Sequence, residues 1–311
     1  MAQSSQKATI AVLPVAGRGT RMLPASKAIA KELMPVGNLP LIAHAIIESR
    51  RAGIKDFVII TNPQKPNFKE VLKQDHAYIK RLRQENRNEI ADQLESFAIH
   101  DDHLVWIEQT QAKGFGHALS LAEEIIDKRP FAVLAPDDFI IQKQDESVPL
   151  KHMIDAQASS GGCVVMVEKV DDHNIVNYGV IKASQYLKHE LFAEGKDFVK
   201  VEDIIEKPSL DQAPSNYGAV ARYVLDKSIF AVLKGVKADQ KGEIQLTDAL
   251  RHFAHKGQLY AFKLSQKRYD CGMISGWINA NIAAASIKNP VLIDQILIEA
   301  NKLKENLRTI S

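Results

Sequence analysis

A glycine-rich and basic segment follows the first apolar run of the chain and reads VAGRGTRMLPASKAIAKE over residues 15–32. Glycine lets the backbone approach a ligand closely, so the N–H groups of such a loop can point at phosphate oxygens. Arg21 offers a planar fork of donors to a phosphate, and Lys31 adds a mobile positive charge. The segment therefore predicts a site for a phosphorylated ligand.

The same segment departs from two well-known phosphate-binding motifs. The P-loop pattern GxxxxGK(S/T) is absent, and the dinucleotide pattern GxGxxG fails at Met22. Taken alone, two glycines after a strand could also form a tight turn within a charged surface loop. The residues thus speak against a P-loop NTPase and against a nicotinamide-dependent dehydrogenase.

Two carboxylates, Asp137 and Asp138, follow the apolar run 131–135. Open α/β sheets bind ligands beyond the carboxyl ends of their strands, and a carboxylate there can hold Mg²⁺ together with phosphate oxygens. Asp137 is therefore placed where a carboxylate can hold Mg²⁺. Asp138 points elsewhere if the strand continues, so we expect a solvated turn residue.

The elements that must position these groups alternate between short β-branched runs and longer helical patterns in the first half of the chain. Uninterrupted apolar strands separated by helices indicate a parallel sheet that is covered on both faces. The expected strands are 10–15, 57–61, 104–107 and 131–135, and the expected helices lie near 40–52, 66–99 and 116–127.

The second half changes rhythm, with strands that lie closer together and partly alternate. Such spacing predicts antiparallel or mixed pairing. The expected strands are 162–167, 178–182, 199–206 and 217–225, and the expected helices lie near 226–235, 245–255 and 275–307. The apolar stripe of the last helix is expected to pack on the chain's own core.

The chain has 311 residues, and 40 lysines and arginines stand against 38 aspartates and glutamates, so the formal net charge is +2. A nearly neutral chain is not a polycation that wraps nucleic acid. No apolar run approaches the ~18 residues of a membrane span. We therefore expect no nucleic-acid partner and no membrane association.

The N-terminus lacks the apolar stretch and cleavage site of a signal peptide. The two cysteines, Cys163 and Cys271, form no CxxC pair, so a structural zinc site is not expected, while a disulfide between them stays open. Two thiols in so long a chain fit a reducing compartment, and we expect a cytoplasmic protein.

Residues 17–32 match the signature GxGTRxLPx(S/T)KxxxKE of the nucleoside triphosphate:sugar-1-phosphate nucleotidyltransferases, and the chain resembles the uridylyl-transferring members of that family. The resemblance covers nearly the whole chain after its polar N-terminal tail, because further family motifs appear in the family's order. These are QTQAKGFGHA (109–118), APDD (135–138), YGV (178–180), IEKP (205–208), APSN (213–216), GEIQLTDA (242–249) and YDCG (269–272).

The resemblance implies a Rossmann-like, three-layer α/β/α nucleotidyltransferase fold with a mixed central sheet. We expect a flexible tail over 1–7, a core over 8–275 and a helical segment over 276–311. Within the core, the nucleotide half would span about 8–140 and the sugar-phosphate half about 141–275. The resemblance also implies a homodimer or a homotetramer.

The implied reaction transfers uridylyl from UTP to glucose 1-phosphate, giving UDP-glucose and pyrophosphate by direct, Mg²⁺-assisted in-line attack. Such a reaction depends on positioning and charge neutralisation and needs no nucleophilic side chain. Two alternatives stay open: dTTP or another hexose 1-phosphate as substrate, and a non-catalytic regulatory protein on the same fold.

The matched motifs carry the family's residue roles. Gln109 would face the base, because a carboxamide offers the donor and acceptor that match an imide edge. Three positions depart from the family pattern: Arg18 adds charge beside the phosphates, Ala30 replaces a proline and loosens the turn before Lys31, and Leu39 replaces a lysine, so no triphosphate contact is expected from position 39. The implied catalytic residues are Arg21, Lys31, Asp137 and Lys207; the nucleotide-binding residues are Ala16, Gly17, Gly19, Thr20, Glu32, Gln109 and Gly114; the sugar-phosphate residues are Tyr178, Gly179, Glu206, Lys207 and Thr247; and the metal ligands are Asp137 and Asp270.

Overall fold

The computed structural model describes residues 6–65, 68–142, 146–183, 192, 197–289 and 291–310. Most of the expected tail over 1–7 therefore lies outside the described residues. Within it, Lys7 forms an ion pair with Asp155, with 2.6 Å between Nζ and Oδ1.

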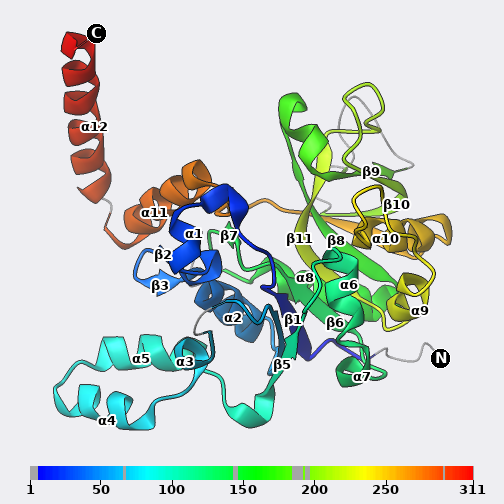
Figure 1. Ribbon diagram of the computed structural model, residues 1–311, viewed down its shortest axis with the longest axis horizontal. Helices are drawn as coiled ribbons and strands as arrows, with labels where there is room; N and C mark the ends of the chain where they lie inside the picture. Colours follow the sequence, from blue (N-terminus) through cyan, green and yellow to red (C-terminus); the bar gives the residue numbers. More distant parts are fainter. Residues whose placement is uncertain are drawn as a thin grey trace.

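A nine-stranded mixed sheet forms the centre of the molecule, in the order β5-β4-β1-β6-β11-β8-β12-β10-β9 (Figure 1). The first four strands are mutually parallel, and β11 joins them to the second half by antiparallel pairing with β6 and β8. Both expected pairing patterns are confirmed, although the sequence did not predict β12. The strands are β1 (Ile10–Pro14), β4 (Asp56–Thr61), β5 (Leu104–Glu108), β6 (Phe131–Leu134), β8 (Cys163–Lys169), β9 (Gly179–Ala183), β10 (Phe198–Glu206), β11 (Tyr217–Leu225) and β12 (Leu259–Lys263).

Helices cover both faces of this sheet, because successive strand residues point to opposite sides. In β1, Ala11 and Leu13 pack in one core cluster with side chains from four helices, and Ile10 and Val12 pack in another with side chains from four other helices. The expected three-layer α/β/α fold is thus confirmed. The first face carries α2 (Leu41–Arg51) and α8 (Pro149–Ser160), and the second carries α6 (Phe115–Ser120), α7 (Glu123–Ile126), α9 (Ile229–Leu233) and α10 (Leu246–His255).

A helical arm occupies the segment expected as helix over 66–99, of which residues 66–67 lie outside the described residues. It consists of α3 (Phe68–Leu72), α4 (His76–Gln84) and α5 (Asn88–Phe97). Ile79, Leu82 and Ala91 form a small core between α4 and α5, and the Asp75 carboxylate caps α4 by accepting from the Tyr78 N–H. The arm projects to one side of the sheet (Figure 1).

The C-terminal segment differs from its prediction in two ways. It forms two helices, α11 (Ile274–Lys288) and α12 (Val291–Ile310), because Asn289 is extended (φ −145°), the conformation favoured before a proline. The expected packing of its apolar stripe on the core is wrong, since α12 extends away from the body (Figure 1) and Leu297, Ile298 and Leu303 are each 56% exposed. An apolar stripe in the sequence shows that one face of a helix needs to be covered. It does not show whether the chain's own core or another surface covers that face.

Short elements complete the described chain. No helix in the described ranges is both long and apolar enough to cross a membrane. The remaining elements are α1 (Ala25–Ala28), the 3₁₀ helices η1 (Thr20–Met22), η2 (Lys31–Leu33), η3 (Asp101–His103) and η4 (Asp172–Asn177), and the strands β2 (Pro35–Val36), β3 (Leu39–Pro40), β7 (Asp138–Ile140) and β13 (Arg268–Asp270).

Candidate active site

The glycine-rich loop and the Asp137 turn meet at one edge of the sheet. They follow β1 and β6, which are parallel neighbours, so the carboxyl ends of these strands lie side by side. Lys31 at the start of η2 forms a hydrogen-bonded ion pair with the Asp137 carboxylate. The residues expected to bind phosphate and metal are therefore brought into direct contact.

A second ion pair lies beside the first. Strand β13 pairs with β7, and this register brings Asp270 opposite Asp138. Arg21 then reaches Asp270, with 3.2 Å between Nη1 and Oδ2. Gly272 lies against both pairs, because a Cβ built there would fall 2.8 Å from Arg21 Nη2, 2.9 Å from Asp270 Oδ1 and 3.0 Å from Asp137 Oδ2. Two cations and two carboxylates thus converge on one small space.

The mutual charges set the titration of this centre. Burial disfavours the Asp137 carboxylate, but Lys31 and Arg21 outweigh burial and hold its pKa below the ordinary value. Burial likewise disfavours the Lys31 ammonium, yet Asp137 and Glu32 raise the pKa of Lys31 above the ordinary value. Both side chains are therefore charged near neutral pH.

The carboxylates fit a magnesium ion of the kind that is shared with a substrate. Asp137 Oδ2 and Asp270 Oδ1 both lie within about 3 Å of the Cβ position built on Gly272, so the two carboxylates are close neighbours. The described residues contain no group of three or more His, Cys, Asp or Glu side chains that could hold a metal ion. Mg²⁺ is commonly held by one or two carboxylates, with phosphates and water completing its shell.

A cationic cavity of about 290 Å³ lies on the other side of Lys31. Arg18, Lys27, Lys31 and Lys65 line it, and no acidic side chain does. Its lining also includes Gly19 and Thr20, and Gly19 adopts φ +63° while its carbonyl accepts a hydrogen bond from Ser26 Oγ. The cavity is suited to a compact polyanion such as pyrophosphate.

Glu32 faces Lys65 and does not line this cavity. The Glu32 carboxylate is buried, and its two oxygens accept from Lys65 Nζ at 2.8 and 2.7 Å. Burial raises the pKa of Glu32 and lowers the pKa of Lys65, although each partner opposes the shift of the other. Lys65 was missed in the sequence, where nothing distinguished it from a surface lysine.

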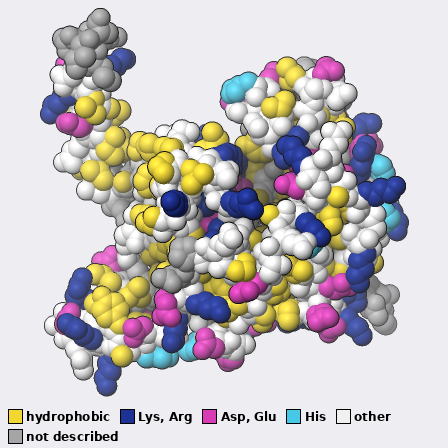
Figure 2. All heavy atoms as spheres, viewed as in Figure 1, with side chains coloured by type: hydrophobic (Ala, Val, Ile, Leu, Met, Phe, Trp, Pro, Cys, Tyr) yellow, Lys and Arg dark blue, Asp and Glu magenta, His cyan; other side chains and the backbone are white. Residues whose placement is uncertain are grey.

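A larger cavity of about 610 Å³ opens beside the carboxylates, lined among others by Arg21, Asp137, Asp270, Tyr178 and Arg268. On this face, basic and acidic side chains gather around a hollow between the α1–α11 side and the β9–α10 side (Figure 2). Both classes of charge thus surround the space where a sugar phosphate would meet the nucleotide.

The predicted sugar-phosphate residues form a contact cluster next to this cavity. Thr247 Oγ1 donates to Glu206 Oε2 at 2.6 Å, and Lys207 Nζ lies 3.1 Å from Glu206 Oε1. A Cβ built on Gly179 would fall 3.2 Å from Thr247 Oγ1 and 3.3 Å from Glu206 Oε2, so only glycine fits easily there. The Tyr178 carbonyl accepts from the Lys207 N–H at 2.9 Å and ties the cavity wall to this cluster.

The expectation that Asp138 is a solvated turn residue is wrong. Asp138 is buried, accepts a hydrogen bond from the Ala221 N–H at 3.0 Å and pairs with Arg268. Arg268 also pairs with Glu168 and donates to the Tyr178 hydroxyl at 2.8 Å. The sequence signal for Arg268 was its position directly before the YDCG motif. That motif drew attention only to Asp270.

The predicted nucleobase residues lie at a second sheet-edge loop. Gln109 is 7% exposed, and its Nε2 approaches His117 Nδ1 at 2.8 Å and the Gly114 carbonyl at 3.3 Å. Gly114 adopts φ +93°, and a Cβ there would fall 2.8 Å from the Ile244 carbonyl, so packing requires this glycine. Ala16 is nearly buried, whereas a Cβ on Gly17 would meet nothing within 4 Å, which leaves room for a planar ligand.

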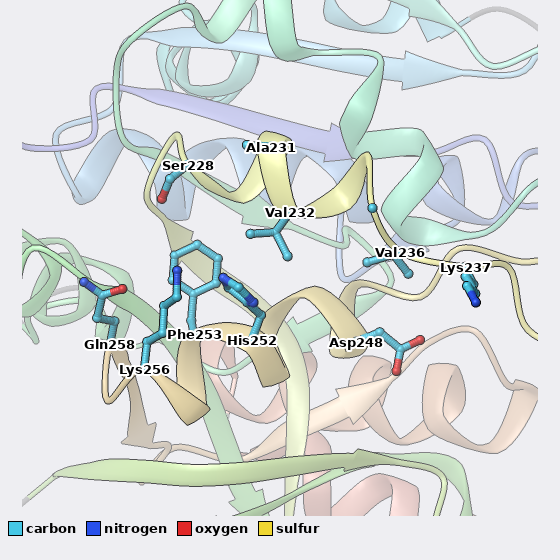
Figure 3. A pocket seen from close by; sticks show the side chains of 11 residues that line it. Ser228, Ala231, Val232, Val236, Lys237, Asp248, His252, Phe253, Lys256 and Gln258 are labelled. Carbon is cyan, nitrogen blue, oxygen red and sulfur yellow. The ribbon is translucent and has the colours of Figure 1, made fainter.

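A cavity of about 770 Å³ lies elsewhere, between α9 and α10. Figure 3 shows Val232, Phe253 and His252 along its middle, with Lys256 and Gln258 near one end and Lys237 and Asp248 near the other. None of the predicted site residues lines it. The side chains that suit phosphate chemistry therefore lie at the two smaller cavities.

Comparison with known proteins shows the family of the chain. The family model described as nucleotidyl transferase matches residues 10–286. A UTP–glucose-1-phosphate uridylyltransferase of Staphylococcus saprophyticus is 32% identical over 95% of this chain and 98% of its own length. A UTP-bound UDP-glucose pyrophosphorylase from Acinetobacter baumannii is 30% identical, covers 94% of this chain and 99% of its own, and superposes with a TM-score of 0.80. A UDP-glucose pyrophosphorylase complexed with UDP-glucose is 32% identical over 89% of this chain and 98% of its own, with a TM-score of 0.75.

Proposed function

Because the chain belongs to the nucleotidyl transferase family, we propose that it transfers the uridylyl group of UTP to glucose 1-phosphate, giving UDP-glucose and pyrophosphate. The observation that carries this proposal is the pairing of Arg21 with Asp270 and of Lys31 with Asp137, between a purely cationic cavity and a mixed one. This arrangement suits a reaction that joins two anions while a third departs.

The chain's own residues supply alignment and charge. The leaving pyrophosphate occupies the cationic cavity, where Lys31 and Lys65 offset its charge. The sugar phosphate enters the 610 Å³ cavity and attacks the α-phosphorus in line, while Arg21 and Lys31 stabilise the charge on the transferring group. Catalysis is positional, so no side chain forms a covalent intermediate.

The cysteines fit this scheme because neither can serve as a nucleophile. Cys163 and Cys271 are free thiols with no exposed surface, and burial raises the pKa of each to about 12. The thiolate is the nucleophilic form, and it is scarce at neutral pH for such groups. Unpaired buried thiols also fit the reducing cytoplasm in which we place the enzyme.

The cofactor we propose is Mg²⁺. Enzymes of this family generally use a divalent metal ion. Asp137 and Asp270 would hold it, and when bound it would neutralise charge on the phosphates. The proposal is supported by the closeness of these two carboxylates, since two oxygen donors plus substrate suit magnesium.

Two groups of residues would recognise the substrates: one around Gln109 and one around Glu206. The Gln109 carboxamide would pair with the imide edge of uracil, with the base lying over Ala16 and Gly17. Glu206 and Thr247 would bind glucose hydroxyls, and Lys207 would contact the sugar phosphate. Uracil and thymine share the imide edge, so Gln109 alone does not separate UTP from dTTP.

A substrate panel tests the proposed function. Purified protein is mixed with UTP or dTTP, with glucose 1-phosphate or galactose 1-phosphate, and with Mg²⁺, and pyrophosphate release is measured. We expect the highest kcat/KM for UTP with glucose 1-phosphate. Ligand binding without pyrophosphate release would instead support a regulatory protein.

We further propose that the protein is a homodimer or a homotetramer that buries exposed apolar side chains of α11 and α12. These side chains are Ile278, Ile287, Leu297, Ile298 and Leu303, each at least 46% exposed. Apolar surface gathered on a projecting helix favours a protein partner. Light scattering after gel filtration tests this, and the double variant Leu297→Glu/Ile298→Glu should give a monomer.

A further inference from the structure

One ion pair is buried far more completely than those at the active site. Arg222 in β11 and Glu48 in α2 have side chains that are 2% and 3% exposed. Arg222 Nε lies 3.1 and 3.2 Å from the two Glu48 oxygens, and Nη2 lies 3.0 Å from Oε2. Removing two charges from water is costly, and apolar replacements of such pairs are often neutral or stabilising. Stability of the fold therefore does not account for this pair.

The rest of the Arg222 guanidinium points at the turn that carries Asp137. Nη1 donates to the Ala135 carbonyl at 2.8 Å, and Nη2 donates to the Asp138 carbonyl at 2.8 Å. These two carbonyls stand on either side of Asp137. Because a guanidinium is planar and rigid, one side chain fixes the distance between both ends of the turn.

Backbone contacts with the same stretch of β11 complete the support. The Ala135 N–H donates to the Ala221 carbonyl at 3.0 Å, and the Ala221 N–H donates to Asp138 Oδ2 at 3.0 Å. The Asp137 carbonyl accepts from the Cys271 N–H at 2.8 Å. The backbone of the turn is thereby held, and the Asp137 side chain is left facing Lys31.

We propose that Arg222 and Glu48 are positioning residues that fix the Asp137 turn for catalysis. Glu48 supplies the counter-charge that keeps Arg222 buried, and Arg222 sets the turn. Neither lines the two cavities assigned to substrates. The inference rests on the proposed function, in which Asp137 acts on the phosphates.

The decisive variant replaces the pair by apolar side chains of similar size, Glu48→Leu/Arg222→Met. It removes both charges together, so no buried charge is left unpaired and the protein should fold, with a Tm below that of the wild type because two buried carbonyls lose their donor. It also frees the Ala135 and Asp138 carbonyls. We expect kcat to fall about 10²-fold, as small misplacements of a reacting group can cause. Hydrogen–deuterium exchange should rise in peptides covering 134–139 and stay unchanged in β1.

Arg222→Lys provides a second test that keeps the buried charge. A lysine ammonium can pair with Glu48 but cannot span both carbonyls as the fork does. We expect a folded protein with kcat lowered at least tenfold and raised exchange over 134–139. The KM values for UTP and glucose 1-phosphate should change less than threefold.

Arg50→Lys is the matched control. Arg50 lies on α2, the helix that carries Glu48. Its guanidinium donates to the carbonyls of Glu95, Ser96 and Ala98 at 3.1, 2.6 and 2.6 Å and so also holds a turn. That turn ends α5, in the helical arm, so its loss should leave kcat and the exchange of 134–139 unchanged.

Any of three results would overturn the proposal. The first two are wild-type kcat and exchange in a folded Arg222→Lys variant, or the same in the apolar double variant. The third is an equal loss of kcat in Arg50→Lys, because weakening any arginine that holds a turn would then suffice. Failure of the proposed function looks different, since the wild type itself would release no pyrophosphate. The exchange of 134–139 would still report on the clamp in that case.

Discussion

Lys65→Met tests the cationic cavity more directly than any other substitution, because it removes one charge and keeps most of the side-chain volume. Lys65 Nζ donates to both oxygens of Glu32 and lines the cavity with Lys31. A hydrogen bond to a charged group contributes about 1.5–3 kcal/mol. At about 1.4 kcal/mol per tenfold, kcat/KM for UTP should fall by a factor of about 12 to 140.

The assay is pyrophosphate release with UTP and glucose 1-phosphate varied in turn. The inhibition constant of added pyrophosphate should rise by a similar factor, because the lost contact is on the leaving group. The KM for glucose 1-phosphate should change less than twofold. Lys69→Met is the control, since this neighbouring lysine lies over the Trp106 ring, 5.8 Å from its centroid, and does not line the cavity.

Stability must be measured alongside activity. Lys65→Met leaves the buried Glu32 carboxylate without its partner, so the pKa of Glu32, already raised by burial, should rise further and the Tm should fall. A folded variant that keeps kcat/KM for UTP within threefold of the wild type would refute the placement of pyrophosphate in this cavity. Equal losses for UTP and glucose 1-phosphate would refute it as well.

Further substitutions test the carboxylate centre and the packing of the base loop. Asp137→Asn should stay folded and lose at least 10²-fold in turnover by the same assay, because an uncharged amide neither offsets Lys31 nor binds a cation well; near-normal activity would contradict this. The pKa of Asp137 in the folded protein lies below the ordinary value of 3.8. The Asp137 carboxylate therefore contributes its full stabilisation above pH 3.8, and this is lost as the pH falls through the pKa of the folded state. The Tm difference between wild type and Asp137→Asn should accordingly shrink below pH 4. Gly114→Ala should lower the Tm more than Gly53→Ala, because both glycines have φ near +94° (93° and 94°) but only the Gly114 Cβ would strike the Ile244 carbonyl, at 2.8 Å; equal Tm losses would show that backbone strain alone acts.

The sequence predicted the parts of the fold that depend on local patterns. Continuous apolar runs marked β1, β4, β5 and β6 because a strand covered on both faces needs apolar residues on both sides. The phosphate loop and Asp137 were found because their residue types are unusual directly after such strands. β12 was missed because Leu259–Lys263 is only five residues long and follows the expected helix 245–255 closely, although Gly257 marks a turn just before it.

The residues that escaped prediction depend on long-range contacts. Arg222 lies in a strand that was predicted, yet nothing nearby shows that its guanidinium meets Glu48, 174 positions earlier. Lys65 and Glu32 are 33 positions apart, and each resembles an ordinary surface charge until the fold buries both. Asp138 was misjudged because its partner Arg268 lies 130 positions away. A buried charge can be identified only once its partner is known.

The ion pairs at the site explain how a nearly neutral chain can bind highly charged substrates. In the described structure, Lys31 pairs with Asp137 and Arg21 with Asp270, so each cation is already held in place by a carboxylate. In the proposed reaction, a phosphate would replace the carboxylate as the partner of Lys31, and Asp137 would then be free to face a cation that arrives with that phosphate. Binding would exchange partners among fixed charges and leave little net charge exposed. This exchange needs the Asp137 side chain to rotate while its backbone keeps its position. The hydrogen bonds from the buried Arg222 to the Ala135 and Asp138 carbonyls would hold the backbone in this way.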